Sequence, residues 1–279
     1  MSKCKIVIIG GASASGKTAL AQWLKTRAET QGKRSRVITL DDFYKPRPNG
    51  VRACKTDDEP AAFDFALYLK MVNDLSQGQQ AQKPNFDYAR KTRAETGETI
   101  NPDDYDVIFI EGILALHGLD QNPDLITIYV EPESYPTLIY NRAVRDALGQ
   151  WCDPVETTKK RELTAGVRDG FFNHILRTKS AADVRITNPH RSTIDPQDLN
   201  QLNELLTEKE SIRIALQTEQ DDGLASQLTI QLAALREKIE PIQKAIKATL
   251  IEPDFNANPD VKELLKVLEP VEESAAQLN

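Results

Sequence analysis

The sequence of 279 residues has few cysteines and no long apolar stretch. Cys4, Cys54 and Cys152 are odd in number and far apart, so they indicate neither a disulfide framework nor a zinc site. The longest apolar run, 107–116, is interrupted by Glu111 and is far shorter than the ~20 residues of a membrane-spanning helix. The apolar run near the N-terminus is too short for a signal-peptide core. These absences predict a reduced, cytoplasmic protein.

Charge and histidine content exclude further classes of protein. The formal net charge is −7, which disfavours nucleic-acid binding because phosphate backbones attract proteins with an excess of Lys and Arg. The three histidines, His117, His174 and His190, are widely separated, and no carboxylates lie near them at the spacings of a metal site. We expect them to form neither a metal centre nor a catalytic triad.

The charge is divided unevenly along the chain. Residues 1–194 carry 27 Lys and Arg against 25 Asp and Glu, whereas residues 195–279 carry 8 against 17. The second segment also contains a single aromatic residue, Phe255. Turn-forming residues at 187–189 and 195–196 lie where the composition changes. The sequence therefore predicts two domains, one spanning 1–194 and the other 195–279.

The first segment alternates between short apolar runs and stretches of helical periodicity. The runs predict buried strands at 5–9, 36–40, 107–110, 125–130 and 183–186. The periodic stretches predict helices at 18–30, 63–75, 136–148 and 163–176. Strands that alternate with helices are typical of an α/β fold, here a P-loop type with a mainly parallel sheet flanked by helices.

The second segment has a purely helical pattern. Apolar residues within 224–250 recur at alternating spacings of four and three, as in a coiled-coil seam. Another helical stretch covers 194–220, so we expect an antiparallel helical hairpin, then a loop at 252–259 and a short helix at 261–268. Three partners suit the apolar seam: the hairpin itself, the first domain and a second copy of the chain.

Residues 11–18 match the pattern G-x-x-x-x-G-K-[ST] at every fixed position. An expected strand precedes the loop and an expected helix follows it, so backbone N–H groups and the helix N-terminus face the phosphates. Lys17 adds positive charge near the β- and γ-phosphates, and the hydroxyl of Thr18 binds Mg²⁺. We therefore predict binding of ATP or GTP by Gly11, Ala12, Ser13, Ala14, Ser15, Gly16, Lys17 and Thr18.

Acidic residues follow two of the expected strands. Asp41 and Asp42 come directly after strand 36–40, at the end where ligands bind in open α/β sheets. Asp41 is a candidate to accept the proton of an attacking hydroxyl or to orient Mg²⁺; capping of a helix is the alternative. Glu111 closes strand 107–110, where a carboxylate acts on Mg²⁺ directly or through water. The alternative for Glu111 is a solvated acid at a strand end.

The order of these motifs resembles the uridine kinase and phosphoribulokinase family of P-loop kinases, and within it uridine kinases. The resemblance extends from about residue 3 to 190. It is carried by the P-loop, by Leu-Asp-Asp-Phe-Tyr at 40–44, Pro-Ala-Ala-Phe-Asp at 60–64, Pro-Asn-Phe-Asp-Tyr at 84–88, Glu-Gly-Ile-Leu-Ala at 111–115, Arg-Ala-Val-Arg-Asp at 142–146 and Ala-Asp-Val at 182–184.

The resemblance implies roles for residues that bind the acceptor. Asp41 matches the acid that acts as base on a nucleoside 5′-hydroxyl, and Asp58 matches the acid that holds the ribose hydroxyls. Phe86 and Tyr88 match aromatic residues that pack around the base, with ordinary core packing as the alternative. Arg93 matches an arginine of the acceptor site.

The region that resembles the lid of these kinases departs from the family pattern. Arg142 and Arg145 match arginines that hold substrate and phosphate, with a solvated helix face as the alternative. Lys91 stands where uridine kinases have a histidine that helps to read the pyrimidine, and Gln-Trp-Cys at 150–152 replaces Arg-Gly-Arg. We hypothesise that the missing cations are replaced by Lys159, Lys160, Arg161 or Arg168.

We therefore expect an enzyme that uses Mg²⁺ and ATP or GTP to phosphorylate a small-molecule hydroxyl, with Lys17, Asp41, Arg142 and Arg145 as catalytic residues. Uridine or cytidine is the favoured acceptor; ribulose 5-phosphate, pantothenate and glycerate are the alternatives. A nucleotide-sensing protein whose hairpin holds partners is the alternative from another class. The expected partners are small molecules, without nucleic acid or membrane, and self-association through the hairpin stays open.

Overall fold

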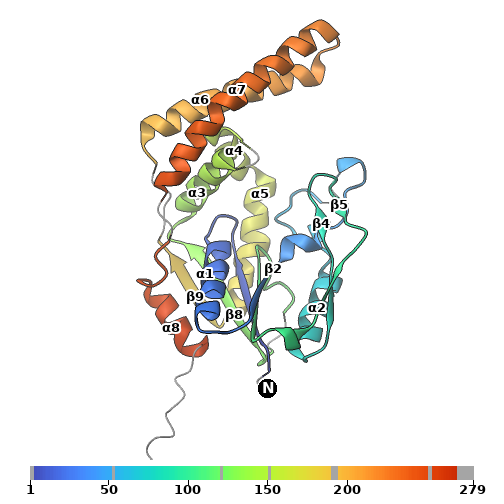
Figure 1. Cartoon of the computed structure of the whole chain (residues 1–279), viewed down its shortest axis with the longest axis vertical. Coiled ribbons are helices and arrows are strands. Elements are labelled where there is room, and N and C mark those ends of the chain that lie inside the picture. Colours follow the sequence, from blue (N-terminus) through green and yellow to red (C-terminus); the bar gives the residue numbers. More distant parts are fainter. Residues whose placement is uncertain are drawn as a thin grey trace, which may run out of the picture. The chain divides into compact units, whose positions relative to one another are not determined.

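The structure is a computed structural model, shown in Figure 1, and it describes residues 3–51, 54–119, 122–149, 152–189, 194–250 and 253–268. Contacts within the chain divide it into two compact units. Unit 1 consists of Met1–Pro132, Asp169–Asn188 and Pro253–Asn279, and unit 2 of Glu133–Arg168 and Pro189–Glu252. Each unit therefore combines segments that are distant in the sequence.

Unit 1 is built on a five-stranded parallel sheet with the strand order β2-β7-β1-β8-β9. Its strands are β1 (Lys5–Gly11), β2 (Ser35–Thr39), β7 (Val107–Gly112), β8 (Leu125–Pro132) and β9 (Val184–Asn188). The central strands β1 and β7 are buried along almost their whole length, which explains their continuous apolar runs. The expected α/β fold with a parallel sheet is confirmed.

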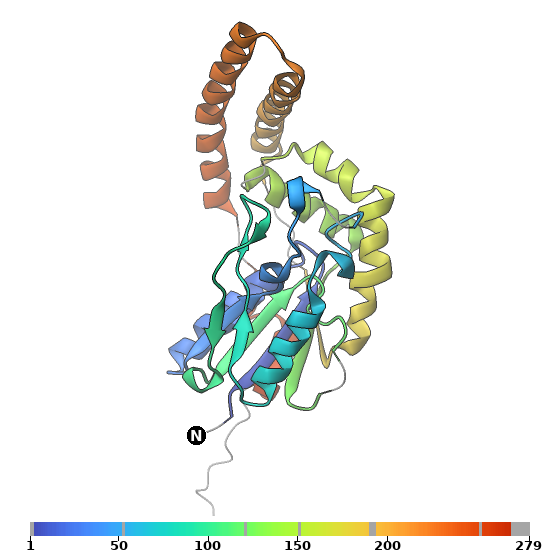
Figure 2. The ribbon, with the colours of Figure 1, turned by 90° about the vertical axis from the view of Figure 1, so that its right-hand side faces the viewer.

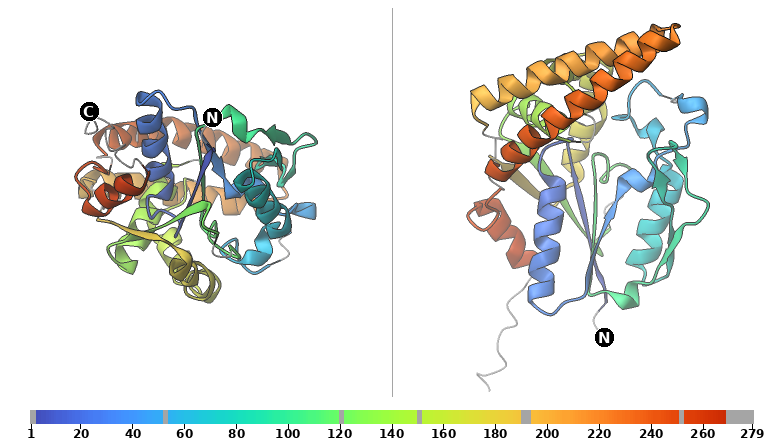
Figure 3. Two further views of the ribbon diagram at one scale, coloured as in Figure 1. Left: turned by 90° about the horizontal axis from the view of Figure 1, so that it is seen from below. Right: turned by 45° about the horizontal axis from the view of Figure 1, so that its top comes forward.

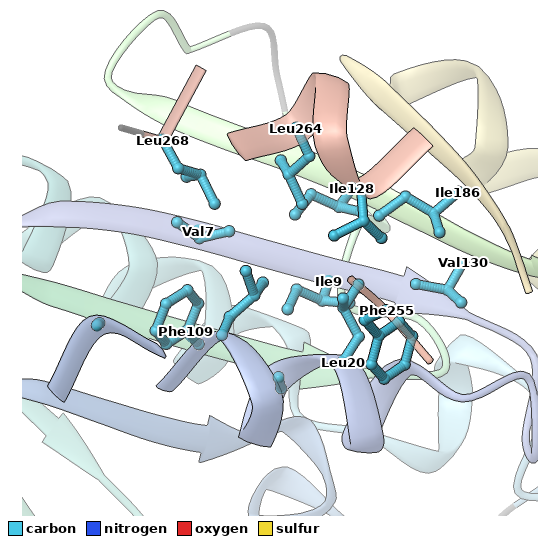
Figure 4. Packing of buried hydrophobic residues seen from close by; sticks show 14 of the residues in the cluster. Val7, Ile9, Leu20, Phe109, Ile128, Val130, Ile186, Phe255, Leu264 and Leu268 are labelled. Carbon is cyan, nitrogen blue, oxygen red and sulfur yellow. The ribbon is translucent and has the colours of Figure 1, made fainter. Parts of the chain in front are cut away.

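Helices cover both faces of this sheet. On one face lie α1 (Lys17–Thr30) and α8 (Pro259–Leu268), which Figure 3 shows as ribbons. They pack against Val7, Ile9 and Phe109 of the sheet (Figure 4). Residues that alternate with these in the strands point to the opposite face, where α2 (Phe65–Ser76) lies (Figure 2). Tyr68 of α2 is fully buried, and its hydroxyl donates a hydrogen bond of 2.7 Å to the carbonyl oxygen of Ala115.

Short elements surround the carboxyl end of the sheet. The 3-10 helix η1 (Leu40–Phe43) follows β2 without a break. Two small antiparallel pairs lie between α2 and β7, and they were not expected from the sequence. Their strands are β3 (Ala81–Lys83) with β6 (Glu98–Ile100), and β4 (Phe86–Asp87) with β5 (Thr92–Arg93). The remaining 3-10 helices of this region are η2 (Pro48–Gly50), η3 (Pro60–Ala62) and η4 (Pro102–Asp104).

Unit 2 is helical. It contains α3 (Tyr135–Leu148), α4 (Val155–Glu162), α6 (Pro196–Thr218) and α7 (Asp222–Thr249). The expected hairpin is present as α6 and α7, and its apolar seam packs on α3 and α4. One buried cluster joins Val144, Val155, Leu206 and Ile239 from all four helices. Among the described residues, no helix is long and apolar enough to span a membrane.

The units differ from the expected division at residue 194. Residues 133–168 lie before that point, yet they fold with the hairpin, and α8 lies after it, yet it packs in unit 1. The reason is that apolar faces select the packing partner, whereas composition records only where the chain changes character. The helical pattern expected at 163–176 is present as consecutive helical segments: α5 (Ala165–Gly170), a π-helix (Phe171–Ile175) and a 3-10 helix (Leu176–Ala181).

Candidate active site

The loop between β1 and α1 has a backbone that only glycine fits at two positions. Gly11 has φ 142° and Gly16 has φ 98°. A Cβ on Gly11 would lie 2.2 Å from the carbonyl oxygen of Val130, and one on Gly16 would lie 2.3 Å from Nδ2 of Asn188. Gly16 is also the N-cap of α1 and supplies no side-chain cap, so the first N–H groups of this helix face the loop uncapped. This is the geometry of an anion site.

The polar side chains of the loop suit a phosphate-bearing ligand. Lys17 is buried, with its Nζ atom 3.5 Å from the carbonyl oxygen of Ala12. The N–H of Ser15 donates to the same oxygen at 3.1 Å, which closes the loop. Ser15 Oγ is buried and has no hydrogen-bond partner in the described part of the chain. A buried hydroxyl without a partner costs free energy that a phosphate oxygen would recover.

Glu111 and Thr18 lie side by side. The hydroxyl of Thr18 donates a hydrogen bond of 3.1 Å to Oε2 of Glu111, and Glu111 is 7 % exposed. The register of the sheet explains the contact, because Glu111 pairs with Ile9 of β1 and with Thr39 of β2 at the carboxyl end. A hydroxyl and a carboxylate are oxygen ligands of the kind Mg²⁺ prefers, so this donor pair fits the metal.

Asp41 and Asp42 lie in the first turn of η1, where the N–H of Asp41 bonds to Oγ1 of Thr39 at 3.2 Å. Asp42 is tied to the buried Lys83 by an ion pair of 2.6 Å. The two neighbouring acids are therefore not equivalent. Asp42 fastens β3 to η1, which is a structural role, and Asp41 is the half-buried acid next to Thr39 at the carboxyl end of the sheet.

Aromatic residues form a cluster beside these acids. Tyr44 stacks on Phe63 at 4.3 Å between ring centroids, and Phe86 lies 5.6 Å from Tyr44 and 5.2 Å from Tyr88. Phe86 is 7 % exposed, whereas Tyr88 is 47 % exposed. Burial, and then the charge of Asp41, raises the pKa of the Tyr88 phenol. Tyr88 therefore offers ring surface to a ligand, while Phe86 is packed as a core residue.

The other residues predicted to bind the acceptor, Asp58 and Arg93, also lie in unit 1, and each has a different set of neighbours. Asp58 is 3 % exposed, and its N–H bonds to Oγ1 of Thr56 at 3.3 Å. Arg93 forms an ion pair of 2.6 Å with Asp64, the residue that caps the N-terminus of α2. Burial raises the pKa of Asp64, but hydrogen bonds from Arg93 and from a backbone N–H outweigh burial, and the pKa is lowered.

The predicted lid arginines lie on α3 in unit 2, held by acids of that unit. Arg142 pairs with Glu162 of α4 at 2.9 Å, and Arg145 pairs with the buried Asp146 at 2.6 Å. Arg161, one of the hypothesised replacement cations, pairs with Asp146 and with Asp153. Lys159, another of them, pairs with Glu156 of its own helix at 2.8 Å. Gln150 and Trp151, which depart from the family pattern, lie outside the described residues.

Some contacts of the site were not anticipated. Asn188, at the end of β9, donates from Nδ2 to the carbonyl oxygen of Ser15 in the phosphate loop, at 2.9 Å. Lys83 and Tyr44 also support η1 and the aromatic cluster. No local pattern marks Asn188, because it is 173 positions from Ser15.

Two of the three histidines, His117 and His174, lie in the described part of the chain. His117 packs edge-on to Phe65, with 4.8 Å between ring centroids. Burial, and then the charge of His174, lowers the pKa of His117. His190 lies outside the described residues. Within those residues, no group of three or more His, Cys, Asp or Glu side chains is arranged to hold a metal ion.

Comparison with known proteins finds relatives that cover two thirds or more of this chain. Uridine-cytidine kinase B of Dictyostelium discoideum is 32% identical over 214 residues, covering 75% of this chain and 85% of that protein. A uridine kinase of Macrococcus caseolyticus is 33% identical over 190 residues, covering 67% of this chain and 89% of that protein. The crystal structure of a putative fructose transport system kinase from a Silicibacter species is 21% identical with a TM-score of 0.49, covering 66% of this chain and 90% of that one.

The match to a family extends over most of unit 1 and the helices α3 and α4. Residues 6–194 match the description "Phosphoribulokinase / Uridine kinase family". The matched range begins one residue after β1 begins and contains the phosphate loop, Asp41, Glu111 and the arginines of α3. The chain therefore belongs to the phosphoribulokinase / uridine kinase family of P-loop kinases.

Proposed function

We propose that this protein transfers the γ-phosphoryl group of ATP or GTP to the 5′-hydroxyl of uridine or cytidine. The observation that carries the proposal is the meeting of three strand ends, which puts the P-loop, the Thr18–Glu111 pair and Asp41 at one edge of the sheet. The likeness to relatives named uridine kinase and uridine-cytidine kinase supports the nucleoside acceptor.

Each residue of the nucleotide end has a task in this reaction. The backbone N–H groups of residues 11–16 and the N-terminus of α1 bind the phosphates. Lys17 places its charge near the β- and γ-phosphates, and Arg142 and Arg145 neutralise the phosphoryl group in transfer. Asp41 accepts the proton of the acceptor hydroxyl as the new P–O bond forms. Most of the rate enhancement then comes from positioning and electrostatics.

Thr18 and Glu111 are the residues that would hold Mg²⁺. When bound there, the ion neutralises charge on the phosphate oxygens. The hydrogen bond from Thr18 provides the buried carboxylate of Glu111 with a partner and holds the two oxygen ligands next to each other.

The aromatic cluster is the part of the site that distinguishes acceptors. Tyr88 presents an exposed ring, which suits stacking on a planar base and gives nothing specific to a bare sugar phosphate. Phe86 supports Tyr88 from behind, and Asp58 and Arg93 are the proposed polar contacts to the acceptor. Glycerate, pantothenate and ribulose 5-phosphate lack the planar ring and are therefore the weaker candidates.

The experiment that tests this proposal measures ADP formation with ATP, Mg²⁺ and a panel of acceptors: uridine, cytidine, ribulose 5-phosphate, pantothenate and glycerate. We expect stimulation by the two nucleosides. Stimulation by another acceptor alone would support kinase activity but would show that the substrate is not a nucleoside. Tight ATP binding without stimulation by any acceptor would favour a nucleotide-sensing protein instead.

The role of Asp41 has its own test. Asp41→Asn removes the proton acceptor while keeping the size of the side chain, so turnover should fall by at least about 100-fold with ATP affinity retained. Asp103→Asn is the matched control, because Asp103 is an exposed acid in the first turn of another 3-10 helix. Undiminished turnover of Asp41→Asn would rule out this residue as the base.

A further inference from the structure

The last described segment of the chain, residues 253–268, packs against α1, the helix that follows the phosphate loop. Phe255 and the apolar face of α8 belong to the same buried cluster as Leu20 and Leu24 of α1, as Figure 4 shows for Leu20, Phe255, Leu264 and Leu268. Phe255 also lies 5.8 Å from the ring of Trp23 on α1. Since α1 begins at Lys17, this segment supports the helix that follows the loop.

The same segment is hydrogen-bonded to the end of β9 at both backbone groups of Thr187. Asn258 donates from Nδ2 to the carbonyl oxygen of Thr187 at 2.9 Å. The N–H of Thr187 donates to Oδ2 of Asp260, also at 2.9 Å. Asn258 is 9 % exposed, and its Oδ1 accepts from the N–H groups of Asp260 and Val261 at the start of α8. One side chain therefore caps α8 and holds β9.

The residue after Thr187 reaches into the phosphate loop. Asn188 is 4 % exposed and donates to the carbonyl oxygen of Ser15 at 2.9 Å. Its Nδ2 atom occupies the space next to Gly16 that any larger residue at that position would fill. Thr187 and Asn188 are adjacent, so contacts that fix the backbone of Thr187 also fix the direction of the Asn188 side chain. A continuous path then leads from Asn258 and Asp260 to the backbone of the loop.

We propose that Asn258 and Asp260 are positioning residues for the phosphate loop, acting through Thr187 and Asn188. These two residues lie outside the part of the chain that matches the family. The segment thus adds to the nucleotide site a support that lies beyond the family core, and it sets how tightly the loop binds the phosphates. The inference rests on nucleotide binding by the loop and not on the identity of the acceptor.

The test is the affinity for ATP with Mg²⁺, measured by titration calorimetry without any acceptor. Asn258→Asp keeps an oxygen to cap α8 but removes the donor to Thr187, because Asp and Asn are similar N-cap residues. We expect ATP binding about fivefold weaker, the worth of one hydrogen bond, with the KM for ATP raised and kcat unchanged. Asp254→Asn is the control: Asp254 is an exposed acid of the same segment that accepts from Asn256 and Ala257.

A second pair of variants covers the case in which Asn258→Asp does not fold. Asp260→Ala should weaken ATP binding by a similar factor, and Asp260→Asn should restore it, because the amide oxygen still accepts from Thr187. A merely structural role would lower the melting temperature in Asp260→Ala without this difference in affinity between the two variants.

The path is tested in an Asn188→Ala background. If Asn258 acts through Asn188, then Asn258→Asp causes no additional loss of ATP affinity there. Equal losses in both backgrounds, or ATP affinity equal to that of the unsubstituted chain in Asn258→Asp, would overturn the inference. If the unsubstituted chain binds ATP but phosphorylates no acceptor, the proposed kinase reaction fails while the binding comparison still decides this inference.

Discussion

The nucleotide end of unit 1 and the arginine-bearing helices of unit 2 hold their proposed functional groups in different ways. In unit 1, the loop depends on backbone geometry: glycines at positive φ and uncapped N–H groups at the start of α1. In unit 2, Arg142 and Arg145 form ion pairs with carboxylates on α3 and α4. The hairpin packs against these two helices. The first arrangement is rigid by construction, whereas the second depends on pairs of side chains and on packing between helices.

This difference has a consequence for substitutions. A change in the loop should affect ligand binding sharply, because little else can take over the role of a backbone N–H group. A change in unit 2 should act first on the stability of that unit, and on the arginines only through it. The two kinds of effect can be measured separately, by ATP titration and by unfolding.

The largest effect is expected for Gly16→Ala. The added Cβ would meet Nδ2 of Asn188 at 2.3 Å and would force an alanine to φ 98°, so the loop must open. We expect ATP binding weakened by more than about 100-fold, measured by titration. Gly78→Ala is the matched control, because Gly78 also has positive φ, at 75°, but a Cβ there has nothing within 4 Å. Equal ATP affinity in both variants would contradict the prediction that ATP binding requires glycine at position 16.

The next largest effect is expected in the seam of the hairpin. Ile239 is 2 % exposed in the cluster that joins α7 to α3 and α4, so Ile239→Ala should destabilise unit 2 by about 2–4 kcal/mol. Ile230→Ala on the same helix should cost less than about 0.5 kcal/mol, because Ile230 is 70 % exposed. Hydrogen exchange, followed segment by segment along the chain, measures the change in stability for both variants. Destabilisation of unit 1 to the same extent would contradict the separation of the units.

The sequence predicted the elements of the fold better than their partners. The parallel sheet and the phosphate loop follow from local patterns: apolar runs, glycines and a helix start within a few residues of one another. The hairpin was also predicted from the spacing of its apolar residues. Its packing on α3 and α4, which belong to the expected first domain, was only one of three alternatives. The return of α8 to unit 1 was not predicted, since its apolar face does not specify which surface will cover it.

For the candidate site, too, local patterns in the sequence predicted some residues but not the contacts between distant ones. Thr18 and Glu111 were predicted as a metal pair, and the structure places their side-chain oxygens 3.1 Å apart. The phosphate loop joins β1 to α1, where Thr18 lies in the first turn, and Glu111 lies in register with Ile9 of β1. The contact from Asn188 to Ser15, and the separate role of Asp42 as partner of Lys83, depend on residues far apart in the sequence. A single sequence carries no signal for such pairs, so these contacts became visible only in the fold.

A smaller effect is expected where charges hold unit 2 together. Asp146 is 2 % exposed and accepts from both Arg145 and Arg161, so Asp146→Asn should lower the free energy of unfolding of unit 2 by about 1–3 kcal/mol. Denaturant unfolding measures this change. Asp124→Asn, in the exposed pair with Lys3, should cost less than about 1 kcal/mol. If the two variants were equally stable, the carboxylate of Asp146 would not be what holds these arginines.

The smallest effect is expected for an ion pair of unit 1, and it depends on pH. Because the pKa of Asp64 is lowered in the fold, its ionised form adds stability above the ordinary pKa of a carboxyl group, and that stability is lost as the pH falls through the lowered value. Arg93→Gln removes the principal hydrogen bond behind the lowering, so the pKa should rise and the loss should begin at a higher pH. At neutral pH the cost should stay below about 1 kcal/mol, since both side chains are 30% exposed.

The measurement for this last variant is a carboxyl-carbon NMR titration of Asp64, with unfolding followed over the same range of pH. Arg90→Gln provides the comparison, because Arg90 is 82% exposed and lies 3.7 Å from Asp87. An unchanged pKa of Asp64 in Arg93→Gln would mean that the backbone N–H of Leu67 and the charge of Lys45 lower it without Arg93. Arg93 could then bind the acceptor at little cost in stability. A raised pKa would instead show that the acceptor must compete with Asp64 for Arg93.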